Sequence, residues 1–403
     1  MSIRNGLFTS ESVSAGHPDK LCDRISDAIL DEFLARDPNA RVACETFAHD
    51  DRIIVAGEFR TRRAEDFAAI RDQADSIVRA TLQQIGYGRA HQDIDPEQCA
   101  VEVRFNDQSR EIAAGVDGGA NLGAGDQGLM FGYATNETEG LTPLAWTLAT
   151  NLIERASGLL RAGASPLRPD GKSQVTVRYR DGVPVGVEAV VLSWQHAPDV
   201  GIAQMRQYLQ REIIDVVVPR EQRTDDFKVY CNPAGSWTIG GPKGDTGLTG
   251  RKIIVDTYGG SCAHGGGAFS GKDPSKMDRS GAYAARWVAK NVVAAGLARR
   301  CTVQLAYAIG VPEPVSISVD TQEDDQTTAN AIATAVRDVF DLSPAAIIRE
   351  LDLLRPIYSA TACLGHFGPW RDPAVYRWER CDRTEALRSA FEVRRRNRAS
   401  SAR

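Results

Sequence analysis

The sequence predicts an α+β protein built from three similar units, each an α/β-sandwich-like domain, packed around a pseudo-threefold axis. A helix, a pair of strands and a second helix recur three times along the 403 residues, and the strand pairs begin near positions 41, 174 and 302. An offset of about 130 residues is too long for a solenoid repeat and suits whole domains. Each sheet would pack one face on its own helices and turn the other face inward, toward the other two units.

The first round begins with a helix over 19–36, where Leu21, Ile25 and Ile29 recur at helical spacing. Pro18 suits the first turn of that helix, and Gly86 suits the end of the next. The other elements of this round are expected at 41–47 and 52–59 (strands), 64–85 (helix) and 101–105 (strand).

The second and third rounds repeat this order. Asp181-Gly182 joins two strand-like runs, 174–180 and 183–194, and this dipeptide is a strong hairpin signal. The other elements are expected at 143–160 and 200–217 (helices), 227–231 and 252–258 (strands), 274–297 (helix), 302–309 and 315–320 (strands) and 327–340 (helix).

Composition excludes several classes of protein. There is no apolar run of the roughly 18 residues that a membrane span needs, and the N-terminus lacks the apolar core of a secretory signal. The eight cysteines form no CxxC pair, which favours reduced thiols and a cytoplasmic location. The net charge of −5 argues against a nucleic-acid partner. The arginine-rich tail over 386–403 is expected to be disordered.

Glycine is concentrated in two windows. Of 36 glycines, seven lie between Gly115 and Gly132 and eleven between Gly240 and Gly271. Because glycine lets a backbone approach a ligand closely, both windows are candidate site loops. The stretch from Lys243 to Arg279, which overlaps the later window and continues just beyond it, carries six cations: Lys243, Arg251, Lys252, Lys272, Lys276 and Arg279. A solvated charged face would explain the charges but not the glycines, so a polyphosphate site is favoured.

Two nucleotide motifs inside these windows lack their usual context. Gly123–Gly128 spells GxGxxG, but no strand precedes it and no long helix follows, so a tight turn presenting Asp126 is favoured. Gly266–Lys272 spells GxxxxGK, but Asp273 stands where a P-loop needs Ser or Thr to bind Mg²⁺.

Three acids outside these windows are candidate cation ligands. Asp19 follows His17-Pro18 at the start of the first helix, where it is either an ordinary first-turn acid or a ligand of Mg²⁺. Glu45 and Glu58 lie inside predicted strands, so each is either on a solvated face or bound to a cation. The residues by themselves leave these alternatives open.

Taken together, four long segments make the chain resemble the S-adenosylmethionine synthetase (methionine adenosyltransferase) family from about residue 5 to about residue 385. They are Leu7-Phe-Thr-Ser-Glu-Ser-Val-Ser-Ala-Gly-His-Pro-Asp-Lys20, Gly123-Ala-Gly-Asp-Gln-Gly-Leu-Met-Phe-Gly-Tyr133, Gly250-Arg-Lys-Ile-Ile-Val-Asp-Thr-Tyr-Gly-Gly260 and His264-Gly-Gly-Gly-Ala-Phe-Ser-Gly-Lys-Asp-Pro-Ser-Lys276.

The resemblance implies domains over 5–106, 123–240 and 241–385, with a mobile lid over 107–122. It implies a homodimer or a dimer of dimers, with sheets in the subunit interface and active sites between subunits. The expected reaction joins ATP and L-methionine into S-adenosylmethionine and cleaves the released tripolyphosphate to diphosphate and phosphate. Two Mg²⁺ per site and one K⁺ per subunit are the expected cofactors.

The resemblance also assigns roles to residues. ATP contacts are expected from His17, Asp170, Lys172, Ser236, Trp237, Asp245, Arg251, Lys252, Ala268 and Lys272. The catalytic residues among them would be His17, Lys172, Arg251, Lys252 and Lys272. Methionine contacts are expected from Glu58, Gln108, Asp126, Asp245 and Lys276. The metal ligands would be Asp19 and Asp278 for Mg²⁺ and Glu45 for K⁺.

The chain departs from the family pattern at two places. Ser236-Trp237 stands where Arg-Phe is usual, and 112–117 replaces a lid segment that commonly holds an Asn-Gln pair. Trp237 can stack on adenine as phenylalanine does. A P-loop-like ATPase or phosphotransferase and a non-catalytic homologue remain the alternative functions.

Overall fold

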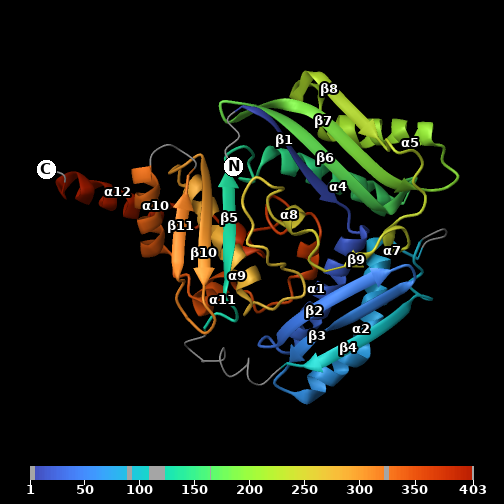
Figure 1. Ribbon diagram of the computed structural model, residues 1–403, viewed down its shortest axis with the longest axis horizontal. Coiled ribbons are helices and arrows are strands. Elements are labelled where there is room, and N and C mark those ends of the chain that lie inside the picture. The colour runs from blue at the N-terminus through green and yellow to red at the C-terminus, as the bar shows by residue number, and fades with distance from the viewer. Residues whose placement is uncertain (1–4, 89–92, 109–122, 164, 322–325, 402–403) are drawn as a thin grey trace.

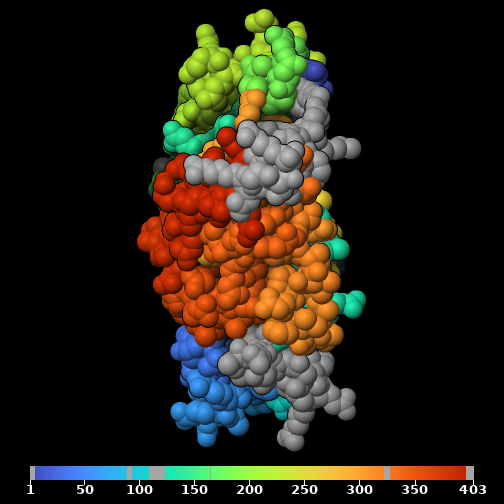
Figure 2. Space-filling view, turned by 90° about the vertical axis from the view of Figure 1, so that its left-hand side faces the viewer, coloured from blue at the N-terminus to red at the C-terminus, as the bar shows by residue number. Residues whose placement is uncertain are grey.

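The computed structural model describes residues 5–88, 93–108, 123–163, 165–321 and 326–401. These residues form three separate sheets, each with helices on one face (Figure 1). The predicted α+β class with three units is therefore confirmed. Figure 2 shows residues beyond about 300 in the middle of one side, between the second unit and the first. Among the described residues, no helix is long and apolar enough to cross a membrane.

The first sheet has the order β4-β3-β2-β9. Its strands are β2 (Arg41–His49), β3 (Arg52–Arg60), β4 (Ala100–Asp107) and the short β9 (Gly247–Leu248), and its helices are α1 (Pro18–Arg36) and α2 (Ala64–Ile85). Val42 and Cys44 of β2 are buried beneath the helices, whereas Glu45 and Phe47 are exposed. Within one chain, the other units therefore do not cover this face of β2.

The second sheet has the order β1-β6-β7-β8. Its strands are β1 (Gly6–Val13), β6 (Leu167–Arg180), β7 (Val183–His196) and β8 (Arg223–Cys231), covered by α4 (Leu144–Ala162). The helix expected over 200–217 is divided into α5 (Ile202–Tyr208), the π-helical η2 (Leu209–Ile214) and α6 (Asp215–Val217), followed by the 3-10 turn η3 (Arg220–Gln222).

The third sheet has the order β11-β10-β5. Its strands are β5 (Gly128–Thr135), β10 (Arg300–Tyr307) and β11 (Ser316–Asp320), with α9 (Met277–Ala294) and α10 (Gln326–Val339) on one face. β1 and β5 thus join sheets whose other strands come later in the chain. Strands of one predicted domain therefore pair with strands of another. The domain boundaries themselves remain a prediction.

The C-terminal segment is helical, so the expectation of a disordered tail over 386–403 is wrong. α12 (Thr384–Ser401) follows α11 (Pro344–Leu351) and the 3-10 turns η4 (Ser359–Ala362) and η5 (Arg377–Glu379). Arg394 of α12 pairs with Asp338 of α10 at 2.8 Å. Tertiary contact of this kind stabilises a helix that an arginine-rich composition does not predict.

The strand expected over 252–258 is also wrong. Residues Ile253–Asp256 form a single helical turn, α8, and α7 (Gly241–Gly244) precedes it. Gly250 and Gly259 flank this turn with φ of 81° and 59°, values that break an extended run. Val255 accepts a hydrogen bond from the indole of Trp146 at 3.0 Å, so the apolar run packs as a loop against α4.

One face of α1 carries four aspartates at a spacing of four residues, Asp19, Asp23, Asp27 and Asp31, here called the aspartate row. Each carboxylate accepts a backbone amide hydrogen from a distant loop. The donors are Leu248 (3.3 Å), Gly250 (2.8 Å), Gly271 (2.8 Å) and Tyr358 (2.9 Å), in that order. The aspartate row therefore fixes the middle and the C-terminal end of the later glycine window onto one helix.

Asp27 also forms a fully buried, bidentate ion pair with Arg279 of α9, at 2.6 and 2.9 Å. We expect Asp27→Asn to lower the free energy of unfolding by about 3–5 kcal/mol, because the Arg279 guanidinium would stay buried without a counter-charge. Urea unfolding measures this loss. The exposed pair of Asp338 and Arg394 supplies the control, since Asp338→Asn should cost no more than about 1 kcal/mol. Equal losses in the two variants would contradict the structural role of Asp27.

Candidate active site

His17 lies at the N-terminus of α1 and is almost completely buried. Its Nδ1 accepts a hydrogen bond from the Asp19 amide at 3.2 Å, so in the neutral ring the proton resides on Nε2. Burial, reinforced by the charges of Lys252 and Lys172, lowers the pKa of His17 to about 2. The site therefore contains a neutral histidine that can donate one hydrogen bond from Nε2.

Asp19 connects this helix end to the later glycine window. Its carboxylate accepts from Lys252 Nζ at 2.6 Å and lies 3.4 Å from Arg251 Nε. The structure thus brings together four of the predicted residues, His17, Asp19, Arg251 and Lys252. With the nearby Lys172, the cations form an electropositive region at the N-terminus of α1, where the helix dipole also favours an anion.

Asp170 and Lys172 enter from β6, on the second sheet. Asp170 is buried, with one carboxylate oxygen accepting the Gly241 amide at 2.9 Å and the other without a partner among the described residues. Burial raises the pKa of Asp170 to about 7. An unpaired buried oxygen is costly unless a ligand satisfies it, which is consistent with the predicted contact to ATP.

Ser236 and Trp237 are held beside this strand by His196. The Nε2 of His196 accepts from the Trp237 amide and lies near Ser236 Oγ, each at 3.2 Å. The indole of Trp237 donates to Ile239 O at 2.7 Å and stays partly exposed. His196 is a residue that sequence reasoning missed, and no pattern in the chain marked it.

The second cluster of predicted residues surrounds the start of α9. Lys272 Nζ donates to Asp278 at 2.7 Å, and Lys276 Nζ pairs with the buried Asp273. Asp273 also accepts from the Val42 amide at 2.7 Å, which ties this loop to β2. The positive charges of Lys276 and Arg41 outweigh burial and keep the pKa of Asp273 below its usual range.

Close packing explains part of the glycine-rich sequence. A Cβ on Gly250 would lie 2.6 Å from the Cβ of Ala268, and one on Gly267 would collide with the Asp278 carboxylate. Ala268 is half-buried against Gly250, which precedes Arg251. Larger residues at these glycines would therefore displace the loop that carries the cations.

The methionine and potassium candidates lie on the first sheet. Glu58 is cross-strand partner to Ala43, one step along the same face from Glu45. Partial desolvation by neighbouring groups is the largest cause that raises the pKa of the Glu45 carboxyl; Lys272 opposes this rise, and Asp23 and Glu58 add to it. The Gln108 amide donates to Phe59 O at 3.0 Å, and its buried side-chain oxygen lacks a partner among the described residues.

Other predicted residues are less tightly tied to these clusters. Asp126 and Asp245 are exposed, and each carboxylate accepts the amide hydrogen of the next residue. The proposed lid lies outside the described residues from 109 onward, so only its first two predicted positions, 107 and 108, have a described structure.

Sequence reasoning also missed the buried charges around Lys20, which follows Asp19 in α1. Lys20 Nζ lies between Asp23, at 2.9 Å, and Asp256. Burial alone would lower the pKa of Lys20, but these two carboxylates raise it above its usual range. The four-residue spacing of the aspartate row, which places all four carboxylates on one helix face, was the signal that could have indicated this network.

Comparisons with known proteins identify the family of this chain. The chain matches three family models of S-adenosylmethionine synthetase: the N-terminal domain over residues 5–110, the central domain over 121–237 and the C-terminal domain over 239–380. Together they account for nearly all of the chain.

Two curated relatives are similar along their whole length. One, an S-adenosylmethionine synthase from a Nitratiruptor species, is 51% identical over 393 residues, which is 97% of this chain and 100% of the relative. Another, with the same name and from Wolinella succinogenes, is 52% identical over 390 residues, covering 96% and 99%. The chain therefore belongs to the S-adenosylmethionine synthetase family.

Proposed function

We propose that the chain joins ATP and L-methionine into S-adenosylmethionine. The methionine sulfur attacks C5′ of the ribose, an S–C bond forms, and the C5′–O bond breaks with its electron pair leaving on tripolyphosphate. Water then cleaves tripolyphosphate to diphosphate and phosphate. The cluster of Lys172, Arg251 and Lys252 around a neutral His17 is the observation that carries this proposal.

The electrostatics of the cluster suit this chemistry. A thioether needs no base, so the barrier comes from separating a sulfonium from a highly anionic leaving group. Preorganised cations around that group are usually the largest catalytic contribution. Because His17 is neutral and protonated on Nε2, it can donate a hydrogen bond to the departing oxygen and leaves the positive charge to the lysines and Arg251.

The acidic residues fit Mg²⁺ bound together with phosphates. Among the described residues, no group of three or more His, Cys, Asp or Glu could hold a metal ion alone. Asp19 and Asp278 each hold a lysine in the chain by itself. Mg²⁺ commonly binds through one or two carboxylates plus substrate phosphates. These two acids would hold it there, where it would neutralise phosphate charge, and Glu45 would hold K⁺.

A second subunit would complete the site. Phe47 and its cross-strand partner Leu248 are exposed on the first sheet, and the Leu248 amide donates to Asp19. An apolar patch beside the anion-binding cluster suits an interface between two copies of the chain. We propose a homodimer or a dimer of dimers with the active site between subunits.

The P-loop alternative lacks support in the loop itself. Asp273, where a P-loop needs a hydroxyl, is buried and occupied with the Val42 and Ser275 amides. No strand leads into this loop, because residues Ile253–Asp256 are helical. Nothing in the described residues favours that function over methionine adenosyl transfer.

Product stoichiometry tests the reaction. With ATP, methionine, Mg²⁺ and K⁺, we expect one S-adenosylmethionine, one diphosphate and one phosphate per turnover, by chromatography and phosphate assay. Formation of ADP and phosphate without methionine would indicate an ATPase instead. Absence of any turnover, in a folded chain, would favour the non-catalytic homologue.

Lys272→Met tests the role of the phosphate cations. We expect kcat to fall by about 100-fold or more, with little change in the Michaelis constant for methionine, because the lost charge acts on the leaving group. The exposed Lys228, on β8, provides a matched control of equal charge change. An unchanged kcat in Lys272→Met would refute the assigned role.

The buried, neutral His17 predicts a pH dependence of stability. Its folded-state pKa of about 2 lies far below the ordinary 6.5, so below pH 6.5 only the unfolded chain binds this proton and stability falls. Between pH 7.5 and 5, His17→Asn should lose about 2 kcal/mol less stability than the parent protein. Urea unfolding at both values measures this. The exposed His49 supplies the control variant His49→Asn, and identical pH dependence in all three proteins would contradict the prediction.

A further inference from the structure

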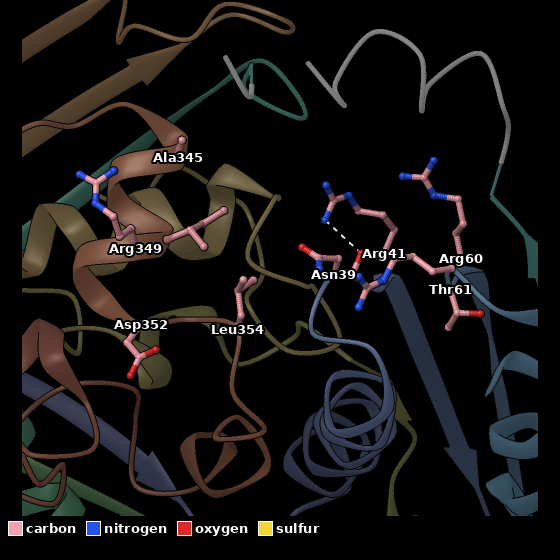
Figure 3. Close-up of a pocket in the computed structure, with 10 residues that line it drawn as sticks. Asn39, Arg41, Arg60, Thr61, Ala345, Arg349, Asp352 and Leu354 are labelled. Atoms are coloured by element: carbon pink, nitrogen blue, oxygen red, sulfur yellow. Dashed lines mark hydrogen bonds between the residues drawn. The ribbon is translucent and has the colours of Figure 1, made fainter. Parts of the chain in front are cut away.

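A cleft of about 770 Å³ separates the end of the first sheet from α11. Residues at the β2 and β3 termini line one wall, and α11 with the segment after it lines the other (Figure 3). None of the lining residues is among the predicted ATP, methionine or metal ligands. A volume of this size is typical of a small-molecule site.

The residues that line the cleft are mainly basic, in a chain whose net charge is −5. Its lining residues include four arginines, Arg41, Arg60, Arg62 and Arg349, against one acid, Asp352. Asp352 already pairs with Arg355 at 3.0 Å and Arg377 at 2.9 Å, so it does not offset the lining arginines.

The arginines differ in how they are held. Figure 3 shows Arg41 and Arg60 extending side by side from paired positions of β2 and β3. The Arg41 side chain is only 15% exposed and lies 4.0 Å from the buried Asp273, so its guanidinium is anchored at the base of the wall. Arg62 pairs with Asp37 at 2.9 Å, and Arg349 with Glu350 at 3.2 Å.

We propose that this cleft binds a phosphate chain, either inorganic polyphosphate or the phosphates of a nucleotide. Guanidinium groups present forked donors that match phosphate oxygens, and arginines on both walls suit an anion of several charges. Ala345 in the first turn of α11 and Arg349 in its last turn both line the cleft, so the helix lies along this wall.

The choice of a phosphate chain over another polyanion rests on the proposed function, in which both ATP and tripolyphosphate carry one. The opposite wall contains Ile348 and Leu354, which offer an apolar surface to a base. A nucleotide would use the arginines and this apolar surface, whereas inorganic tripolyphosphate would use the arginines alone.

Calorimetric titration of the full chain, without methionine, tests the proposal. Inorganic tripolyphosphate and an ATP analogue with an imido bridge between the β and γ phosphates serve as separate probes. For at least one probe, we expect two classes of site in the parent protein. Arg60→Gln/Arg349→Gln should weaken one class by at least about tenfold and retain kcat, because each lost guanidinium removes charge-assisted hydrogen bonds.

Arg71→Gln/Arg211→Gln is the matched control, since both arginines are exposed and lie outside the cleft. It should retain both classes of site, and Lys272→Met should retain the class that the cleft variant loses. A single class of site in the parent, or equal binding by the cleft variant and the control, would overturn the proposal. Formation of S-adenosylmethionine is measured separately, so failure of the cleft and failure of the proposed reaction give different results.

Discussion

The attachment of the later glycine window to the aspartate row of α1 is the constraint on which the rest of the site depends. Asp23 and Asp27 accept the amide hydrogens of Gly250 and Gly271, which bracket the segment carrying Arg251 and Lys252. Buried carboxylates are stable only when hydrogen-bonded or paired. The loop and the helix therefore stabilise each other, and neither position is set by local sequence alone.

The same arrangement resolves an electrostatic difficulty. Several cations must stand close together to receive a polyphosphate, and their mutual repulsion destabilises the folded chain in the absence of that ligand. The chain limits this cost by pairing Lys252 with Asp19 and Lys272 with Asp278, and by holding His17 neutral. In the proposed reaction, the phosphates of ATP would replace these carboxylates as partners of the lysines, and the carboxylates would then be available to Mg²⁺.

The two faces of the first sheet differ in exposure and in the residues they carry. On β2, buried residues face the helices, while the opposite face carries Glu45, Phe47 and the arginine pair of Arg41 and Arg60. The candidate ligands of K⁺ and methionine thus lie on one side of the first sheet. The candidate subunit interface and the candidate phosphate-binding arginines lie on the same side. Strand alternation makes this possible, because one strand can be core on one face and binding surface on the other.

Much of the fold could be predicted from local pattern. The helices over 18–36 and 64–85 and the hairpin at Asp181-Gly182 follow from apolar periodicity and turn chemistry. β1 could not be predicted in this way, because its polar residues Thr9, Ser10 and Ser12 form a strand through pairing with β6, about 160 residues away in the chain. The apolar run at Ile253 was mistaken for a strand, since periodicity cannot register the packing of Trp146 against it.

The sequence by itself determined which residues are available for chemistry: the glycines, the cations among them, and His17 with Asp19 at a helix start. Only the tertiary structure decided their state. Burial among cations makes His17 neutral, the aspartate row fixes where Arg251 and Lys252 stand, and Asp273 becomes a structural acid and not part of a P-loop. Charge state and position depend on neighbours that are distant in the chain, and such neighbours are defined only by packing.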